Sequence, residues 1–289
     1  MKNKSGNTAF GAAAVRLMEQ YEPENKRLFN DPVVYHITGI FLRFILKSKS
    51  LKNYFVRKSE EIIPGIIGGQ ICRTRYIDEK TLDLLKDIEQ IMILGAGFDT
   101  RAYRLKGIGN TDIYEIDLPE IQMVKKKRLK NYLGKFPANV TFIPIDFNRE
   151  KLEDVLERSS FDMTKPSLVI LEAVTQYLDD KSVEKVLQFI SQLSNDSYLI
   201  FTYILKDVIE RKTEKANKMM GYLEKKGSPF LFGINPSEIK TFLSKYNLEM
   251  IADVGTEYYQ ENYLEPLNRN ILVTEIERIN LSRVNTNLS

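Results

Sequence analysis

The sequence predicts an α/β protein with a Rossmann-like, doubly wound sheet of seven mostly parallel strands, helices on both faces and an N-terminal helical lid. From about residue 76, short apolar runs alternate with amphipathic segments, which is the pattern of consecutive βαβ units. A glycine turn, Gly95-Ala96-Gly97, follows the first run, and acidic residues follow the next ones. Ligands of such sheets bind beyond the carboxyl ends of the strands, so these residues are candidates for a binding site.

The composition is that of a globular protein and excludes several other classes. The chain has 289 residues, of which 43% are hydrophobic and 28% charged, so it can bury a large core. Its 42 basic and 39 acidic residues leave a net charge of +3, which argues against a nucleic-acid or membrane partner. The single cysteine, Cys72, excludes an internal disulfide and a cysteine-based metal cluster. We expect a cytoplasmic protein without a metal, because the first residues also lack a secretory signal.

Residues 1–75 are expected to form the lid. Segments 8–21, 32–47 and 51–63 carry apolar residues at helical spacings. The most apolar stretch, 33–46, is too short to span a bilayer and is interrupted by His36 and Arg43, so it predicts a buried helix. The glycine-rich segment 63–69 indicates a hinge or a tight packing site.

Residues 76–289 are expected to form the Rossmann-like core, with 204–235 as an inserted helical segment on the substrate side. The predicted strands are 90–94, 112–116, 140–144, 167–171, 197–203, 249–255 and 270–276, and the clearest helices are 119–133, 179–193, 206–223 and 236–246. The basic run 125–128 lies in one of these helices. We interpret it as a solvated outer face and not as a nucleic-acid patch.

The residues after the glycine turn indicate which nucleotide the site suits. A dinucleotide fold requires a third glycine, so that the pyrophosphate can rest on a helix N-terminus, and here Thr100 occupies that position. Asp117, at the end of the second predicted strand, can accept hydrogen bonds from both hydroxyls of a ribose. Glu115 is an alternative acceptor. Asp117 could also serve only as an acid at a helix N-terminus.

Two further strand ends carry candidate residues. Asp146 and Phe147 follow the third strand, where a carboxylate can accept from an adenine amino group while the ring flanks the base. Glu172 directly follows four apolar residues, and a carboxylate in that position needs a partner. A cationic ligand group or an internal salt bridge would provide one.

Three motifs together resemble the leucine carboxyl methyltransferase family, and more narrowly its bacterial branch, which includes polyketide carboxyl O-methyltransferases. The similarity covers about residues 8–276, and the motifs are Gly-Ala-Gly-Phe-Asp-Thr-Arg at 95–101, Glu-Ile-Asp-Leu-Pro at 115–119 and Glu-Ala-Val-Thr-Gln-Tyr-Leu at 172–178. Phe98 stands where the family more often has leucine, which should change only packing.

The resemblance implies S-adenosyl-L-methionine as the cofactor and assigns roles to several residues. Gly95 and the following Ala96 and Gly97 would contact the methionine part, and Asp117 the ribose. Asp146 and Phe147 would border the adenine, and Glu172 would face the amino end. Arg73 would bind the cofactor carboxylate, since a guanidinium can pair with it through two hydrogen bonds. Arg75 is an alternative that spacing does not exclude.

The predicted reaction is O-methylation, most simply of a carboxylate on a small molecule or at a peptide or protein C-terminus. A carboxylate is ionised at neutral pH and needs no general base, so the site should work by positioning donor and acceptor. The only histidine, His36, lies in the apolar stretch and is not expected to act as a base. The alternatives are an NAD(P)-dependent oxidoreductase and an inactive S-adenosylmethionine-binding protein. The acceptor and the oligomeric state are left open.

Overall fold

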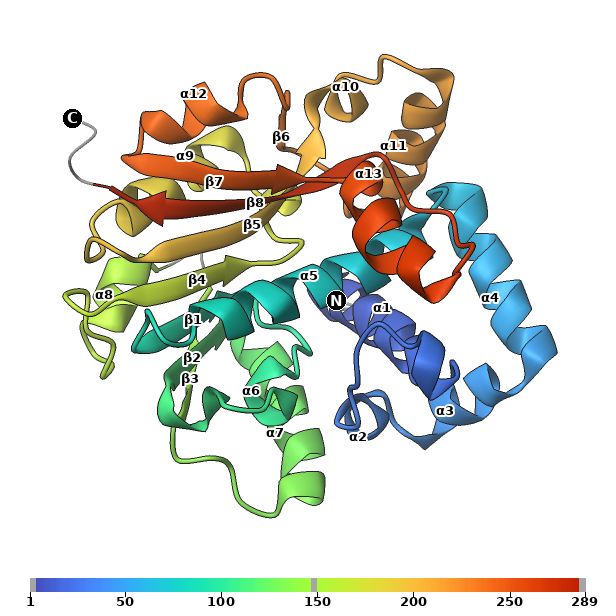
Figure 1. The fold of residues 1–289 in the computed structure, drawn as a ribbon, viewed down its shortest axis with the longest axis horizontal. Helices are drawn as coiled ribbons and strands as arrows, with labels where there is room; N and C mark the ends of the chain where they lie inside the picture. The colour runs from blue at the N-terminus through green and yellow to red at the C-terminus, as the bar shows by residue number, and fades with distance from the viewer. Residues whose placement is uncertain (1–3, 147–149, 286–289) are drawn as a thin grey trace.

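The computed structural model describes residues 4–146 and 150–285, with side chains described from Thr8 onward. Within these residues, eight strands form one sheet in the order β3-β2-β1-β4-β5-β8-β7, with β6 pairing beside β5 (Figure 1). The strands are β1 (Gln90–Leu94), β2 (Asp112–Asp117), β3 (Val140–Pro144), β4 (Ser167–Leu171), β5 (Tyr198–Leu205), β6 (Gly233–Ile234), β7 (Leu248–Val254) and β8 (Glu277–Val284).

The strand order reverses beside β1. The chain runs from β1 outward to β2 and β3 and then returns to place β4 on the other side of β1, all in parallel register. Further along, β8 lies antiparallel between β5 and β7. The carboxyl ends of β1, β2 and β4 therefore meet at a point of reversed winding, where open α/β sheets bind their ligands.

Helices cover both faces of the sheet, as expected for strands that are buried on both sides. They are α1 (Lys4–Glu19), α2 (Val34–Thr38), α3 (Ile40–Lys47), α4 (Lys49–Ile62), α5 (Ile66–Leu84), α6 (Arg101–Arg104), α7 (Pro119–Leu133), α8 (Leu152–Leu156), α9 (Asp180–Ile190), α10 (Lys206–Ile209), α11 (Glu214–Lys226), α12 (Ile239–Ser244) and α13 (Thr256–Tyr259). Helices α1, α2, α3 and α5 share one apolar core with one face of the sheet, while α8, α9 and α12 pack on the other face. None of the helices in the described part of the chain is long and apolar enough to cross a membrane.

Helix α5 connects the N-terminal helices to the sheet. A Cβ atom at Gly68 would collide with the backbone of Leu272, so glycine is required for the close approach of α5 to residues 272–274. The glycine-rich segment is thus a tight packing site. Helix α5 runs without interruption across residue 75. The division into 1–75 and 76–289 stays a prediction, and its boundary falls inside this helix.

Two details of the predicted sheet are wrong. The described residues contain eight strands and not seven, because the two-residue β6 pairs with the end of β5. The last strand was expected at 270–276, but it begins at Glu277, which pairs with Ile204. The apolar residues before it lie along the glycines of α5 instead, where the N–H of Thr274 donates to the carbonyl of Gly65 at 2.9 Å. Their hydrophobicity reflects that helix contact.

The predicted helices are found with four differences. The helix expected at 32–47 is interrupted at Gly39, whose φ is +81°, and gives α2 and α3. The outer face of α3 is exposed and not buried. The helix expected at 206–223 is divided into α10 and α11. In the basic run, Lys125 is buried and pairs with Glu115 at 2.7 Å, so this lysine belongs to the core and not to a solvated face.

Candidate cofactor-binding site

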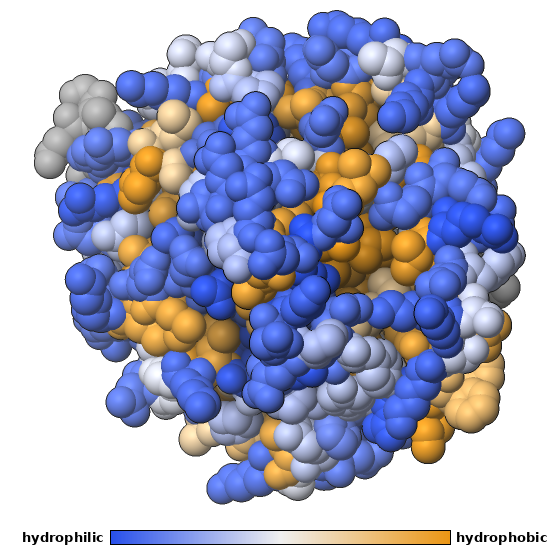
Figure 2. All heavy atoms as spheres, turned by 45° about the vertical axis from the view of Figure 1, so that its right-hand side comes forward, coloured by the Kyte–Doolittle hydropathy of each residue, from blue (hydrophilic) through white to orange (hydrophobic). Residues whose placement is uncertain are grey.

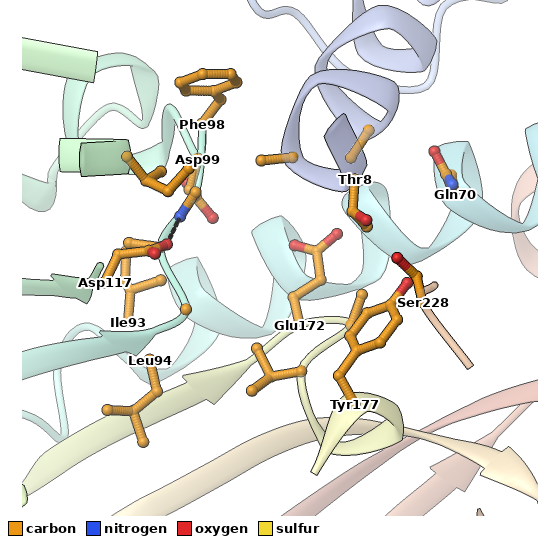
Figure 3. Close-up of a pocket in the computed structure, with 18 of the residues that line it drawn as sticks. Thr8, Gln70, Ile93, Leu94, Phe98, Asp99, Asp117, Glu172, Tyr177 and Ser228 are labelled. Carbon is orange, nitrogen blue, oxygen red and sulfur yellow. Dashed lines mark hydrogen bonds between the residues drawn. The ribbon is translucent and has the colours of Figure 1, made fainter. Parts of the chain in front are cut away.

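A pocket of about 420 Å³ lies at the reversal point of the sheet. This volume is within the roughly 300–1,000 Å³ that small-molecule sites occupy. The carboxyl ends of β1, β2 and β4 form its floor, helices α1 and α5 border it, and residues 227–231 close another side. Figure 3 shows its polar side chains in two groups.

The first group, here called the sheet end, begins with the glycine turn after β1. The N–H groups of Gly95 and Ala96 both donate to the carbonyl of Ile116, at 2.9 and 3.0 Å, which ties the turn to β2. Gly95 has a φ of +68°, and a Cβ there would collide with the Val174 side chain. Only glycine therefore allows the turn to form the pocket floor. Gly95, Ala96 and Gly97 all line the pocket, as predicted for a ligand that approaches the backbone closely.

The sheet end also includes Asp117 at the tip of β2, Asp99 in the turn after β1 and Glu172 after β4. The two carboxylate oxygens of Asp117 accept the N–H of Gly97 at 2.5 Å and the N–H of Leu118 at 2.6 Å (Figure 3). Each oxygen keeps a lone pair for a further donor, so the carboxylate is oriented and still able to bind two hydroxyls. The competing residue, Glu115, is buried against Lys125 and does not line the pocket. The geometry therefore favours Asp117 as the ribose acceptor.

Glu172 lies at the end of β4 and joins the pocket to two arginines. Its oxygens accept from Arg73 Nε at 2.9 Å and from Arg101 Nη1 at 2.7 Å, while 18% of the side chain stays exposed. The next residue, Ala173, has a φ of +55°, which is uncommon for a residue with a side chain. Its N–H donates to Thr202 Oγ1 at 2.9 Å. This turn leaves Glu172 facing the pocket. Of the two partners considered from the sequence, the structure contains the internal salt bridge, and the exposed part of the carboxylate also lines the pocket.

These contacts belong to a larger network of buried charges. Arg101 Nε donates to Asp78 at 2.8 Å, its Nη1 also contacts Asp99, and Arg73 Nη1 reaches Glu277 at 2.8 Å. Within the described residues the network contains the arginines Arg16, Arg73, Arg101 and Arg104 and the carboxylates Asp31, Asp78, Asp99, Glu172 and Glu277. Four positive charges face five negative ones. The network therefore carries a net charge of −1. Two of its carboxylates, those of Asp99 and Glu172, line the pocket.

The charge states follow from these neighbours. Burial by itself would raise the pKa of Asp99 and of Glu172, but the adjacent arginines lower both pKa values below their ordinary range. Burial raises the pKa of Asp117, opposed by the two N–H donors. Burial likewise raises the pKa of Tyr177, so this phenol keeps its proton at neutral pH. The sheet end therefore presents carboxylates to a cationic ligand, and Tyr177 presents a hydrogen-bond donor.

The second group, here called the lid end, consists of Thr8, Gln70, Tyr177 and Ser228 (Figure 3). Thr8 comes from α1, Gln70 from α5, Tyr177 from the turn after β4 and Ser228 from the segment between α11 and β6. The Tyr177 hydroxyl bonds to Thr8, and Gln70 Oε1 is buried without a partner among the described residues. Sequence reasoning did not assign these residues, since they lie on four separate segments. The inserted segment 204–235, expected on the substrate side, contributes Leu231 to the lining as well as Ser228, whereas Phe230 and Phe232 are buried in the core.

The remaining predicted residues lie as follows. Arg73 lines the pocket, whereas Arg75 points outward to Glu79, at 3.6 Å. Asp146 follows β3 and is not among the lining residues, so its contact with adenine stays a prediction, and Phe147 lies outside the described residues. His36 is exposed on α2, stacked on Tyr132 with ring centroids 3.8 Å apart, away from the pocket. Among the described residues, no group of side chains suits a metal ion.

Comparisons with known proteins agree with this geometry. The family model described as leucine carboxyl methyltransferase matches residues 9–191, well over half of the chain. A protein of Mycolicibacterium vanbaalenii named "Putative S-adenosyl-L-methionine-dependent methyltransferase" is 30% identical over 228 residues, which cover 77% of this chain and 73% of that protein.

Solved structures show the same fold at low sequence identity. A crystal structure of a protein from Thermobifida fusca, described as a "putative methyltransferase", matches with a TM-score of 0.58 and 16% identity over 82% of this chain and 89% of that one. A DUF574 family protein from Streptomyces avermitilis matches with a TM-score of 0.56 and 12% identity over 92% and 99% of the two chains. The predicted fold class is confirmed, apart from the strand count.

Proposed function

The chain belongs to the leucine carboxyl methyltransferase family and is an S-adenosylmethionine-dependent methyltransferase, and we propose that it methylates a carboxylate oxygen. The acceptor would be a small molecule or the C-terminus of a peptide or protein, in the cytoplasm. The observation that carries the proposal is the pocket itself, which has an anionic sheet end and a neutral, hydrogen-bonding lid end.

The sheet end suits the cofactor. S-adenosylmethionine carries a sulfonium and an ammonium group, and it supplies an activated methyl group. The excess negative charge of the network, presented by Asp99 and Glu172, complements those cations. Asp117 has lone pairs directed to the pocket for two ribose hydroxyls. Arg73 lies beside Glu172 and would attract the cofactor carboxylate, so we keep it as the predicted partner.

Thr100 also argues against the nicotinamide alternative. Its side chain is buried, and its hydroxyl donates to Asp31 at 2.6 Å, so the residue fills the position that a dinucleotide-binding turn keeps open with glycine. The helix that follows, α6, has only four residues and offers little of the dipole that would hold a pyrophosphate. This arrangement agrees with family membership.

The lid end suits an anionic oxygen acceptor. Tyr177 keeps its proton and can donate a hydrogen bond, while Gln70 Oε1 is a buried acceptor that a donor group next to the carboxylate could satisfy. The lining residues include no histidine, lysine or cysteine among the described residues. A carboxylate acceptor needs no base, so alignment of the reacting atoms and exclusion of water would supply the rate enhancement.

The test is transfer of a labelled methyl group from S-adenosylmethionine to components of a cell extract, followed by treatment of the products with mild alkali. A methyl ester is hydrolysed and releases labelled methanol, whereas a methyl ether or a methylamine is stable. We expect alkali-labile label. Stable label would overturn the carboxylate acceptor, and binding of S-adenosylhomocysteine without any transfer would favour the inactive binding protein.

A further inference from the structure

Helix α3 exposes an apolar face that no described part of the chain covers. The exposed fractions are 78% for Ile40, 76% for Phe41 and 76% for Phe44. Leu42 and Leu46 on the opposite side of the same helix are buried in the core. The sequence predicted one buried helix here, and the structure shows that only half of the apolar side chains are needed for the core. The others form a ridge at the edge of the molecule.

The ridge continues into the start of α4 and is accompanied by positive charge. Leu51 is 45% and Tyr54 is 56% exposed. Residues 40–58 contain six basic residues and no acidic one, namely Arg43, Lys47, Lys49, Lys52, Arg57 and Lys58. Lys52 pairs with Glu22, and Arg57 and Lys58 pair with Glu61. Lys47 and Lys49 are exposed and have no ion-pair partner in the described ranges 4–146 and 150–285.

We propose that this surface, formed by Ile40, Phe41, Phe44, Lys47, Lys49, Leu51 and Tyr54 and here called the α3–α4 surface, binds the surface of a membrane that contains anionic lipids. Exposed aromatic and aliphatic side chains next to lysines are the combination by which amphipathic helices lie in the headgroup region of a bilayer. The apolar side chains insert between the headgroups, and the lysines pair with lipid phosphates.

The charge pattern favours a membrane over a second copy of the chain. A two-fold contact through this surface would place the same patch on both subunits face to face, and so bring the positive charges of Lys47 and Lys49 from both subunits into one interface. Such a contact would bury positive charges without partners, which is unfavourable. An anionic lipid surface instead supplies the missing negative charge.

The surface is connected to the pocket. Helix α3 contacts α1 and α4, and α4 contacts α5, while α1 and α5 both border the pocket (Figure 1). Figure 2, which brings the right-hand side of Figure 1 forward, shows apolar side chains exposed among the hydrophilic ones on this side of the molecule.

A small net charge and the lack of a spanning helix led to the expectation of no membrane partner. Neither observation excludes a local surface of this kind.

The experiment is co-sedimentation of the full chain with vesicles of phosphatidylcholine alone and of phosphatidylcholine mixed with phosphatidylglycerol. We expect binding at least about tenfold stronger to the anionic vesicles, reduced by added salt. Lys47→Gln together with Lys49→Gln should weaken this binding by about tenfold or more. Phe41→Ser together with Phe44→Ser should weaken it to a similar or larger extent, because the inserted rings are lost.

Met123→Ser together with Val124→Ser is the matched control, since it removes two exposed apolar side chains, 68% and 41% exposed, from α7. It should leave vesicle binding unchanged, and binding of S-adenosylhomocysteine should verify that every variant is folded. The proposal is overturned if the wild-type chain does not sediment with anionic vesicles, or if the control weakens binding as much as the α3–α4 variants. Concentration-dependent dimerisation that Phe41→Ser with Phe44→Ser abolishes, without vesicle binding, would identify a second copy as the occupant instead.

Discussion

The two ends of the pocket differ in how their polar groups are held. At the sheet end, Asp117 accepts hydrogen bonds from two backbone N–H groups, and Glu172 accepts from two buried arginines of the charge network. At the lid end, Thr8, Gln70, Tyr177 and Ser228 are neutral and come from four separate segments. A charged end whose carboxylates are held by fixed partners is suited to one invariant ligand, whereas neutral groups on separate segments can be exchanged without disturbing the core. We infer that the sheet end binds the cofactor and that the lid end selects the acceptor.

The largest expected effect comes from breaking the network below the sheet end. Arg101 has a 1% exposed side chain and contacts Asp78, Asp99 and Glu172. Arg101→Ala should lower the free energy of unfolding by about 3–5 kcal/mol, because three buried carboxylates lose a shared partner. Urea denaturation followed by circular dichroism measures the change.

Arg75→Ala is the control for this variant. Arg75 has a 45% exposed side chain and pairs with Glu79 four residues away on the same helix, so its loss should cost less than about 1 kcal/mol. Equal effects of the two substitutions would show that the network does not hold the sheet end. If Arg101→Ala does not fold, Arg101→Lys should still be clearly less stable than wild type, because lysine cannot reproduce the guanidinium geometry.

Asp117 tests the sheet end as a binding site. Asp117→Ala should weaken binding of S-adenosylhomocysteine by roughly 2–4 kcal/mol, since two ribose hydroxyls and two N–H groups lose their acceptor. Isothermal titration calorimetry measures this. Asp112→Ala, at the exposed opposite end of β2, should leave the affinity unchanged. An unaltered dissociation constant in folded Asp117→Ala would remove Asp117 from the cofactor site.

Tyr177 tests the lid end with a smaller expected effect. Tyr177→Phe removes one hydroxyl and should raise the KM for the acceptor about five- to tenfold, equivalent to about 1 kcal/mol, while the affinity for S-adenosylhomocysteine stays the same. Tyr222→Phe, on the outer side of α11, is the matched control. If Tyr177→Phe weakened the cofactor and left the acceptor KM unchanged, the two ends would not have separate roles.

The sequence predicts the sheet end better than the lid end for a physical reason. Gly95 directly follows β1, and Asp117 is the last residue of β2. Because parallel strands bring their carboxyl ends to one edge of the sheet, the position of these residues after apolar runs already predicts that they line the same pocket. Gln70 and Tyr177 meet only when the N-terminal helices fold against that edge, which no local pattern records. The role of Glu172 was foreseen only in part, because its arginine partners are 71 and 99 residues away.

The same limit explains the errors in the fold. The apolar run before Glu277 was assigned to a strand, although its hydrophobicity serves the contact with the start of α5, at Gly65 directly before the helix and Gly68 within it. Lys125 was expected in solvent because its neighbours are basic, whereas Glu115 on the adjacent strand pairs with it in the core. Both errors arise where a distant segment determines the environment of a residue.

The smallest effect is expected from the one histidine. His36 lies on α2, outside the pocket, and its ring stacks on Tyr132. Partial desolvation of the imidazole, together with the charge of Arg43, lowers its pKa. His36→Gln should therefore keep the single-turnover rate of methyl transfer within about tenfold of wild type, whereas loss of a working general base commonly costs about 10² to 10⁴ in rate. Tyr132→Leu is the control for the lost ring contact.

The pH dependence completes this test. Asp99 and Glu172 have lowered pKa values in the folded protein, so the stability that they contribute is fully present above their unfolded values near pH 4 and is lost only on acidification below them. Asp99 and Glu172 should thus stay ionised between about pH 6 and 8, and their titration should contribute no change in rate over that range. A carboxylate acceptor is ionised throughout, so the single-turnover rate should be flat. A rate that rose with an apparent pKa at or below about 6.5, and that lost this dependence in His36→Gln, would require base-assisted methylation of a hydroxyl instead.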